Sequence, residues 1–124
     1  MIKLYTDAAT KGNPGPTGLG ALLVAGQEQV QVKQAAPRPL SNHEGEFAAA
    51  RFGFTTLQKR FPQAGIVYFY TDSRLLADAV GKGYAKHHQA ELDLLLAHMD
   101  GFATVITPWG PEKQSQGAHH LANH

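Results

Sequence analysis

The start of the chain alternates between apolar and more polar positions, which predicts a short β-strand. Over residues 2–7 the sequence Ile-Lys-Leu-Tyr-Thr-Asp has the two-residue period of a strand with one buried face. The segment 10–16, Thr-Lys-Gly-Asn-Pro-Gly-Pro, is rich in turn formers and ends this strand. Asp7 is therefore expected where the strand stops.

Two further runs predict a β-hairpin. Residues 19–25 are almost continuously apolar, and after a Gly-Gln-Glu turn Val30 and Val32 alternate with polar residues. This pattern indicates a second strand with one face in solvent. Pro37 and Pro39 then end the antiparallel part.

The clearest helical signal follows. Ser41 and Glu44 have the spacing of a capping box, in which a hydroxyl and a carboxylate satisfy the first amides of a helix. Apolar residues then recur at helical spacing, namely Phe47, Ala50, Phe54, Leu57 and Phe61. The pattern predicts a helix of about four or five turns.

The remaining elements alternate between strand and helix. Residues 66–70, Ile-Val-Tyr-Phe-Tyr, predict a strand covered on both faces, which ends at Thr71 and Asp72. The later pattern predicts helices over 75–80 and 92–99, a strand over 102–107, and a helix from about residue 113 to the end with Ala118, Leu121 and Ala122 as its packing face. The order of elements predicts a mixed sheet with helices on its faces.

Length and composition narrow the class of protein. With 124 residues, of which 43% are hydrophobic and 17% charged, the chain is expected to form one domain over residues 1–124 with its own core. It has no cysteine, which excludes disulfides and thiolate metal sites. The absence of a leader-like or membrane-spanning apolar run leads us to expect a cytoplasmic protein without a membrane partner.

The charge balance limits how the chain can bind nucleic acid. Eleven basic and ten acidic residues give a formal net charge of +1. This excludes a strong polycationic grip, although a local basic patch remains open.

Three carboxylates are candidates for shared chemistry. Asp7 and Asp72 each follow the apolar part of a predicted strand, and open α/β sheets carry their ligand sites at the carboxyl ends of strands. Glu46 lies one turn inside the long predicted helix, beside Gly45, which permits close approach to the sheet. Mutual repulsion and desolvation would raise the pKa values of three gathered carboxylates or draw a cation into the site, and oxygen ligands favour Mg²⁺ or Mn²⁺. The alternative is that each acid is a turn former, a helix cap or a solvated helix residue.

Several motifs then resemble the ribonuclease H type 1 family, over about residues 4–123. Residues 5–21, Tyr-Thr-Asp-Ala-Ala-Thr-Lys-Gly-Asn-Pro-Gly-Pro-Thr-Gly-Leu-Gly-Ala, are similar to the opening strand, the catalytic Asp and the Gly-Asn-Pro-Gly loop of the family. Residues 41–47, Ser-Asn-His-Glu-Gly-Glu-Phe, and 70–73, Tyr-Thr-Asp-Ser, resemble its helix start and a later strand end. The resemblance implies an α/β ribonuclease H-like fold, with a mixed five-stranded sheet of an antiparallel hairpin plus parallel strands and with helices on both faces.

The resemblance also implies a set of metal ligands. It assigns Asp7, Glu46 and Asp72 to a two-ion site for Mg²⁺ or Mn²⁺. The fourth position, where the family usually has Asp, is His119 in this chain. A neutral imidazole suits Mn²⁺ better than Mg²⁺. Alternatively, His119 only caps or packs near the site, or the site has degenerated.

Substrate-contacting positions of the family match Asn13, Ser41, Asn42, His43 and, more weakly, Arg74. Short polar groups at a Gly-Pro loop and a helix start suit phosphate and 2′-hydroxyl contacts. For Asn13 the alternative is a simple turn residue, and for Ser41 a plain helix cap. The chain lacks the basic helical protrusion and the further loop His of some family members, so we expect weaker grip and slower turnover.

The implied activity is metal-dependent hydrolysis of the RNA strand of an RNA/DNA hybrid, leaving 3′-hydroxyl and 5′-phosphate ends. The expected enzyme is a monomer that needs no organic cofactor. The main rival is a weak or degenerate module that binds hybrid, structured RNA or a protein partner without efficient cleavage. A strand-transfer or proofreading nuclease module is disfavoured by the complete Gly-Asn-Pro-Gly loop and the short length.

Overall fold

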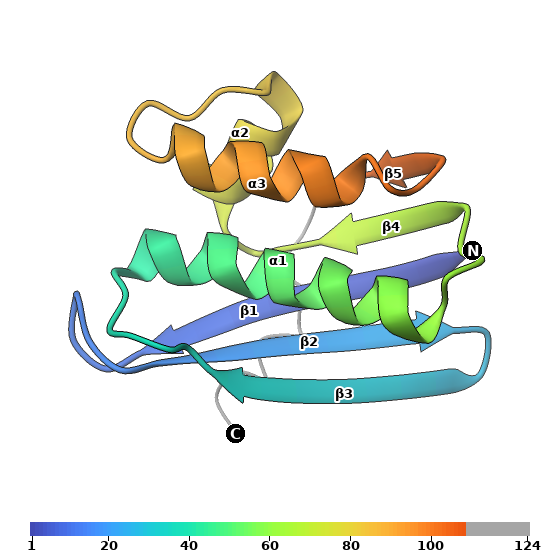
Figure 1. Ribbon diagram of the computed structural model, residues 1–124, viewed down its shortest axis with the longest axis horizontal. Helices are drawn as coiled ribbons and strands as arrows, with labels where there is room; N and C mark the ends of the chain where they lie inside the picture. Colours follow the sequence, from blue (N-terminus) through green and yellow to red (C-terminus); the bar gives the residue numbers. More distant parts are fainter. Residues whose placement is uncertain (109–124) are drawn as a thin grey trace.

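Five strands form one sheet in the described part of the chain, with three helices packed on it or beside it (Figure 1). The computed structural model describes residues 1–108. The strands are β1 Ile2–Thr10, β2 Thr17–Ala25, β3 Glu28–Ala35, β4 Ile66–Tyr70 and β5 Thr104–Ile106, and the helices are α1 Asn42–Arg60, α2 Arg74–Lys82 and α3 Gln89–Met99.

The sheet is mixed, as the sequence predicts, and its strands follow the order β3-β2-β1-β4-β5. β1, β2 and β3 pair in antiparallel fashion, whereas β4 is parallel to both β1 and β5. The chain passes from β3 through α1 into β4, because a parallel return requires a long crossover. As a result, β1 and β4 lie side by side in the middle of the sheet (Figure 1).

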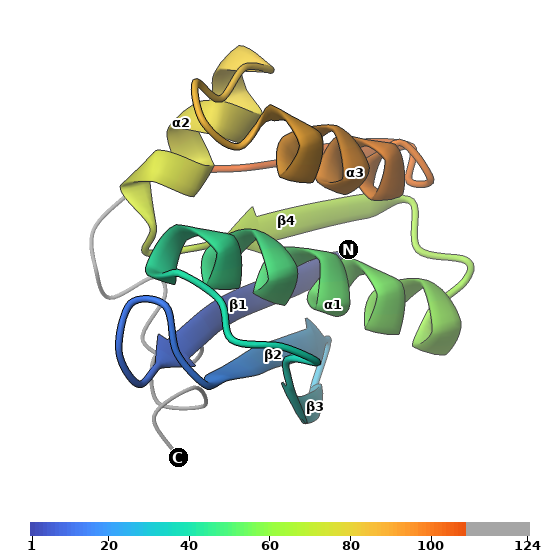
Figure 2. The same ribbon diagram turned by 60° about the vertical axis from the view of Figure 1, so that its left-hand side comes forward.

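Helix α1 lies across β1 and β2, and α3 lies beside it (Figure 2). The core between them is formed by side chains that are fully buried, including Leu4, Leu23, Phe47, Phe54, Leu57 and Phe69. Two glycines let α1 approach β1. A Cβ on Gly53 would lie 2.7 Å from Cγ2 of Thr6, and one on Gly45 would lie 3.2 Å from Cβ of Ala8. The close packing of α1 on the sheet therefore depends on glycine at these two positions.

Strand β4 is covered on one face by the described residues, not on both. Val67 and Phe69 are fully buried toward α1 and α3, whereas Ile66 is 47% exposed and Tyr68 and Tyr70 are half-buried. The helix expected from about residue 113 lies outside the described residues. Among residues 1–108, no helix combines the length and the apolar character that crossing a membrane requires.

Two predicted strand ends are corrected by the structure. β1 does not stop at Asp7 but continues to Thr10, because β2 keeps pairing with it as far as Thr10 and Thr17. β5 is confined to residues 104–106 rather than 102–107, since its pairing with β4 covers only three residues. Asp7 therefore lies within the antiparallel ladder between β1 and β2, but beyond the end of the parallel ladder between β1 and β4.

The substitution Gly53→Ala should lower the free energy of unfolding by up to about 2 kcal/mol. Overpacking a core contact costs about 1–3 kcal/mol, from which the gain of about 1 kcal/mol for replacing a helical glycine is subtracted. The new methyl group would meet Thr6 and Leu4 of β1. Denaturant unfolding measures the change.

Gly81→Ala is the matched control, because Gly81 also lies in a helix but has no atom within 4 Å of the added Cβ. This variant should be as stable as the parent or more stable, by up to about 1 kcal/mol. Equal losses in both variants would contradict the close approach of α1 to β1.

Candidate active site

The register between β1 and β4 brings Asp7 and Asp72 to one place. The last pair of the parallel ladder is Tyr5 with Tyr70, and each aspartate follows its tyrosine by two residues. Beyond this pair β4 ends and the chain turns into α2, whose N-cap is Ser73. The two carboxylates therefore meet at the carboxyl end of the parallel ladder, where open α/β sheets place their ligand sites.

Helix α1 supplies the third carboxylate, Glu46. The capping box predicted from the sequence is present: the Glu44 amide donates to Oγ of Ser41 at 3.1 Å, and the Ser41 amide donates to Oε1 of Glu44 at 2.9 Å. Because the next residue, Gly45, lies close to β1, Glu46 reaches the strand. The amide of Ala8 donates to Oε1 of Glu46 at 3.1 Å.

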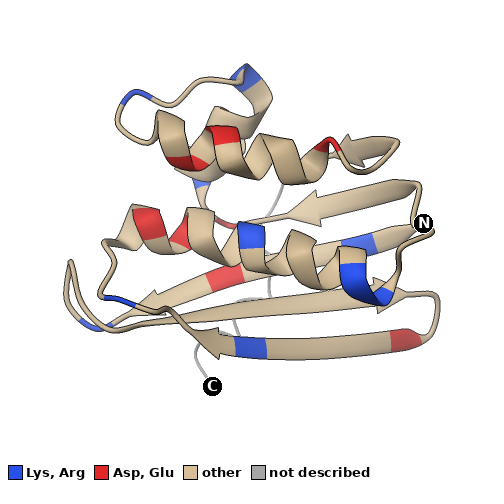
Figure 3. Ribbon diagram, in the orientation of Figure 1, with Lys and Arg blue, Asp and Glu red and all other residues tan. Residues whose placement is uncertain are grey.

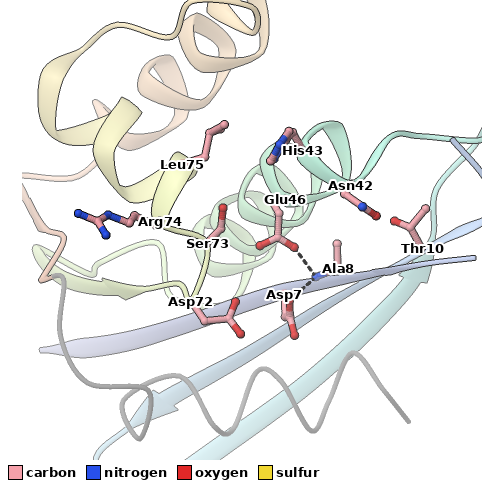
Figure 4. Close-up of a pocket in the computed structure, with 10 residues that line it drawn as sticks. All are labelled: Asp7, Ala8, Thr10, Asn42, His43, Glu46, Asp72, Ser73, Arg74 and Leu75. Atoms are coloured by element: carbon pink, nitrogen blue, oxygen red, sulfur yellow. Dashed lines mark hydrogen bonds between the residues drawn. The ribbon is translucent and has the colours of Figure 1, made fainter. Parts of the chain in front are cut away.

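The three acids converge, as the sequence predicts. One carboxylate oxygen from each of Asp7, Glu46 and Asp72 lies within 4.8 Å of the others. Asp7 is buried, Glu46 is half-buried and Asp72 is exposed, so the group is open on the side of Asp72. The Ala8 amide donates both to Oδ1 of Asp7, at 2.8 Å, and to Glu46, and thereby ties two of the carboxylates to one backbone atom (Figure 4).

The electrostatics of this group favour a bound cation. Burial raises the pKa of Glu46 from 4.5 to about 8, and the charges of Asp7 and then Asp72 add to the rise. Without a cation, Glu46 therefore holds a proton at neutral pH. A set made only of carboxylate oxygens, with one of them kept protonated by its neighbours, fits a hard divalent ion such as Mg²⁺ or Mn²⁺.

A pocket of about 580 Å³ surrounds the three acids (Figure 4). Three of the residues predicted to contact substrate, Asn42, His43 and Arg74, line it together with the acids. Asn42 and His43 come from the first turn of α1, and Arg74 comes from the first turn of α2. The starts of two helices therefore form the rim on either side of the carboxylates.

The other two predicted substrate residues hold the start of α1. Oδ1 of Asn13 accepts a hydrogen bond from the Asn42 amide at 2.9 Å, so Asn13 is more than a turn residue. It links the β1–β2 loop to a helix that begins 29 positions later. Ser41 acts as the helix cap and does not line the pocket, which supports the structural interpretation of this residue.

Four residues that line the pocket were not among the predicted site residues, namely Ala8, Thr10, Ser73 and Leu75. The Ala8 amide has no signature in the sequence, because every non-proline residue carries such a donor. Ser73 was identifiable as a cap, since it directly precedes α2 and its Oγ accepts from the Leu76 amide at 3.2 Å. His119 lies outside the described residues.

A second hollow of about 590 Å³ adjoins the first and shares three of its lining residues, His43, Arg74 and Leu75. Its other lining residues come from α2 and the α2–α3 connection, including Lys82, Tyr84, Lys86, His87 and His88. Figure 3 shows the basic positions along this connection. Tyr84 is 60% exposed. The hollow thus combines cationic groups with an exposed aromatic ring next to the carboxylates.

Comparison with protein families and curated proteins gives consistent matches. The family model described as RNase H matches residues 1–98. The "Putative hydrolase EbsB" of Enterococcus faecalis is 31% identical over 98% of this chain and 91% of that protein. The "Ribonuclease HI" of Synechocystis is 36% identical over 72% of this chain, and the match spans about half of that relative's length, 53%.

A solved structure described as LC11-RNase H1 in complex with RNA/DNA hybrid shares the fold. It has a TM-score of 0.77 at 21% identity and covers 99% of this chain and 94% of that one. At this identity the likeness concerns the fold alone.

Proposed function

Since the chain belongs to the RNase H family, whose model matches residues 1–98, we propose that it hydrolyses the RNA strand of RNA/DNA hybrids in a metal-dependent reaction. The proposed cleavage is endonucleolytic and leaves 3′-hydroxyl and 5′-phosphate ends. The observation that carries the proposal is the convergence of Asp7, Glu46 and Asp72, within 4.8 Å, at an open pocket.

The carboxylates are the proposed ligands of two divalent ions, with His119 as a fourth ligand from outside the described residues. Bound divalent ions activate a water molecule and stabilise the charge on the leaving oxygen of a phosphodiester. Asp7 is the most buried of the three acids and offers a carboxylate oxygen within 4.8 Å of the other two, so it would be the ligand that the two ions share. Glu46 gives up its proton when a cation binds.

The other residues of the pocket orient these acids and hold the strand. The Ala8 amide fixes one oxygen of Asp7 and one of Glu46. Arg74 and His43 stand at the rim on opposite helix starts, where they suit contacts with backbone phosphates. Asn42 is held by Asn13, and its amide side chain suits a 2′-hydroxyl.

The neighbouring hollow supports binding of the second strand of a duplex. It continues from the catalytic pocket through His43, Arg74 and Leu75, and carries Lys82, Lys86 and the exposed ring of Tyr84. Cations neutralise phosphates and an aromatic ring stacks on sugars or bases. Arg74, Lys82 and Lys86 are the three lysine or arginine side chains that line this hollow, so we expect a modest grip on the duplex.

A substrate panel tests the proposal. The full chain is incubated with a labelled RNA/DNA hybrid, a DNA duplex and an RNA duplex, each with Mg²⁺ and with Mn²⁺. We expect cleavage of the hybrid only, in its RNA strand. Binding of the hybrid without cleavage under any ion would instead establish the rival, a degenerate binding module, and cleavage of the DNA duplex would point to another nuclease class.

His119→Asp should raise Mg²⁺-supported turnover several-fold, because a carboxylate is a harder and anionic ligand. His119→Ala should lower activity with either ion, and the parent should work better with Mn²⁺ than with Mg²⁺. Initial rates of hybrid cleavage measure these effects. If His119→Ala cleaves as fast as the parent with both ions, His119 is a bystander and the three carboxylates suffice.

A further inference from the structure

Two tyrosines stack on each other two residues before the paired aspartates. The rings of Tyr5 on β1 and Tyr70 on β4 lie with their centroids 4.8 Å apart and their planes 14° from parallel. Neighbouring strands in a sheet are about 4.7–4.9 Å apart, so the rings stack at the spacing of the strands that carry them. Both rings are half-buried, and burial together with the neighbouring Tyr70 raises the pKa of Tyr5.

The position of this pair in the ladder sets it apart from the other aromatic contacts. Tyr5 and Tyr70 are the last residues paired between β1 and β4, and Asp7 and Asp72 follow them by two residues each. Past the stack, β1 is paired with β2 alone among residues 1–108, and Asp7 faces Gly20 there, while the chain after β4 turns away into α2. No ladder joins the two strands at the level of the carboxylates.

We propose that the Tyr5–Tyr70 stack is a positioning pair, which holds the ends of β1 and β4 together so that Asp7 and Asp72 stand at metal-binding separation before the metal arrives. This inference rests on the metal site of the proposed function. It assigns a role to two side chains that are not ligands themselves.

The need for such a device follows from the charges of the site. One carboxylate oxygen from each of Asp7, Glu46 and Asp72 lies within 4.8 Å of the others, and acidic groups gathered this closely oppose their own convergence. An aromatic stack across β1 and β4 holds the two strand ends together against this repulsion, and it does so without adding charge. A site held in its binding geometry binds its ligand more tightly, because the ligand does not have to draw the groups together.

The test is the affinity of the full 124-residue chain for Mn²⁺, measured by calorimetry without substrate. Tyr5→Leu and Tyr70→Leu should each raise the dissociation constant about 3- to 10-fold, the range expected for loss of one aromatic pair. The double variant should be little worse than either single one, since both substitutions remove the same stack. Tyr5→Phe and Tyr70→Phe keep the rings and should stay within about twofold of the parent.

Tyr68→Leu is the matched control. Tyr68 is half-buried on the same strand and pairs with Lys3, but stands four residues before Asp72. We expect it to lose stability as Tyr70→Leu does, with no change in Mn²⁺ affinity. In the cleavage assay the Leu variants of the stack should need more metal for half-maximal rate, with kcat near the parent value at saturating metal.

The outcomes separate this inference from the proposed function. If the parent binds Mn²⁺ and the stack variants bind it equally well, the positioning role is wrong and the metal site stands. Equal losses in the Phe and Leu variants would also overturn it, because they would assign the effect to the hydroxyl groups. If the parent itself binds no Mn²⁺, the metal site of the proposed function fails.

Discussion

Replacing Asp7 by Asn should reduce cleavage of the RNA strand by at least about 1,000-fold, because the loss of a shared ligand removes several kcal/mol of transition-state stabilisation. Asp7 is the buried member of the carboxylate group, and its Oδ1 accepts the Ala8 amide at 2.8 Å. An Asn side chain keeps the size and one carbonyl oxygen but loses the charge. Steady-state rates with Mg²⁺ and with Mn²⁺ measure the effect.

The same substitution should not unfold the protein. It removes one negative charge from a crowded group, so without metal the Asp7→Asn variant should be at least as stable as the parent. Asp100→Asn, at an exposed position after α3, is the matched control and should cleave like the parent. Loss of activity in both variants, or a large loss of stability in Asp7→Asn, would contradict the role of Asp7 as a metal ligand.

Glu46→Gln should abolish activity while stabilising the metal-free protein at alkaline pH. The pKa of Glu46 is raised from 4.5 to about 8 by burial, Asp7 and Asp72. Its contribution to folding is thus fully present below pH 4.5 and is lost as the pH rises to about 8, because the unfolded chain gives up the proton more readily. Gln mimics the protonated side chain and escapes this loss.

The difference between Glu46→Gln and the parent should therefore grow across this window. Near pH 4 the two proteins should unfold at similar temperatures. Above pH 8 without metal, Gln should be more stable by an amount on the order of a few kcal/mol. Thermal unfolding in the presence of a chelator measures the difference. A constant difference from pH 4 to pH 9 would show that Glu46 does not titrate in this range.

The sequence predicts the elements of this fold well because most of them carry a local signal. The capping box at Ser41 and the run of apolar residues at helical spacing define α1, and the continuous apolar run defines β4. The length of β1, in contrast, could not be predicted from a local signal. Its last residues are strand only because β2 pairs with them, and such pairing between distant segments has no local signature.

The candidate site also has features that the sequence predicts and features that it does not. Residue types and strand ends predict the gathering of Asp7, Glu46 and Asp72, since the parallel register places two of them together. The sequence does not reveal that Gly53 seats α1 against Thr6 or that one amide, of Ala8, holds two carboxylates. These features depend on contacts between segments that are far apart in the chain. The roles of Asn13 and Arg74 toward substrate stay predictions.

The most direct test of the central claim is an analysis of product ends. An RNA strand labelled at its 5′ end is annealed to DNA and incubated with the parent chain or Asp7→Asn, in Mn²⁺, in Mg²⁺ or in chelator. We predict internal RNA fragments with 3′-hydroxyl ends, formed by the parent alone and only with a divalent ion. Cleavage that persists in chelator or in Asp7→Asn, or the absence of fragments with the parent under both ions, would contradict a metal-dependent ribonuclease built on these three carboxylates.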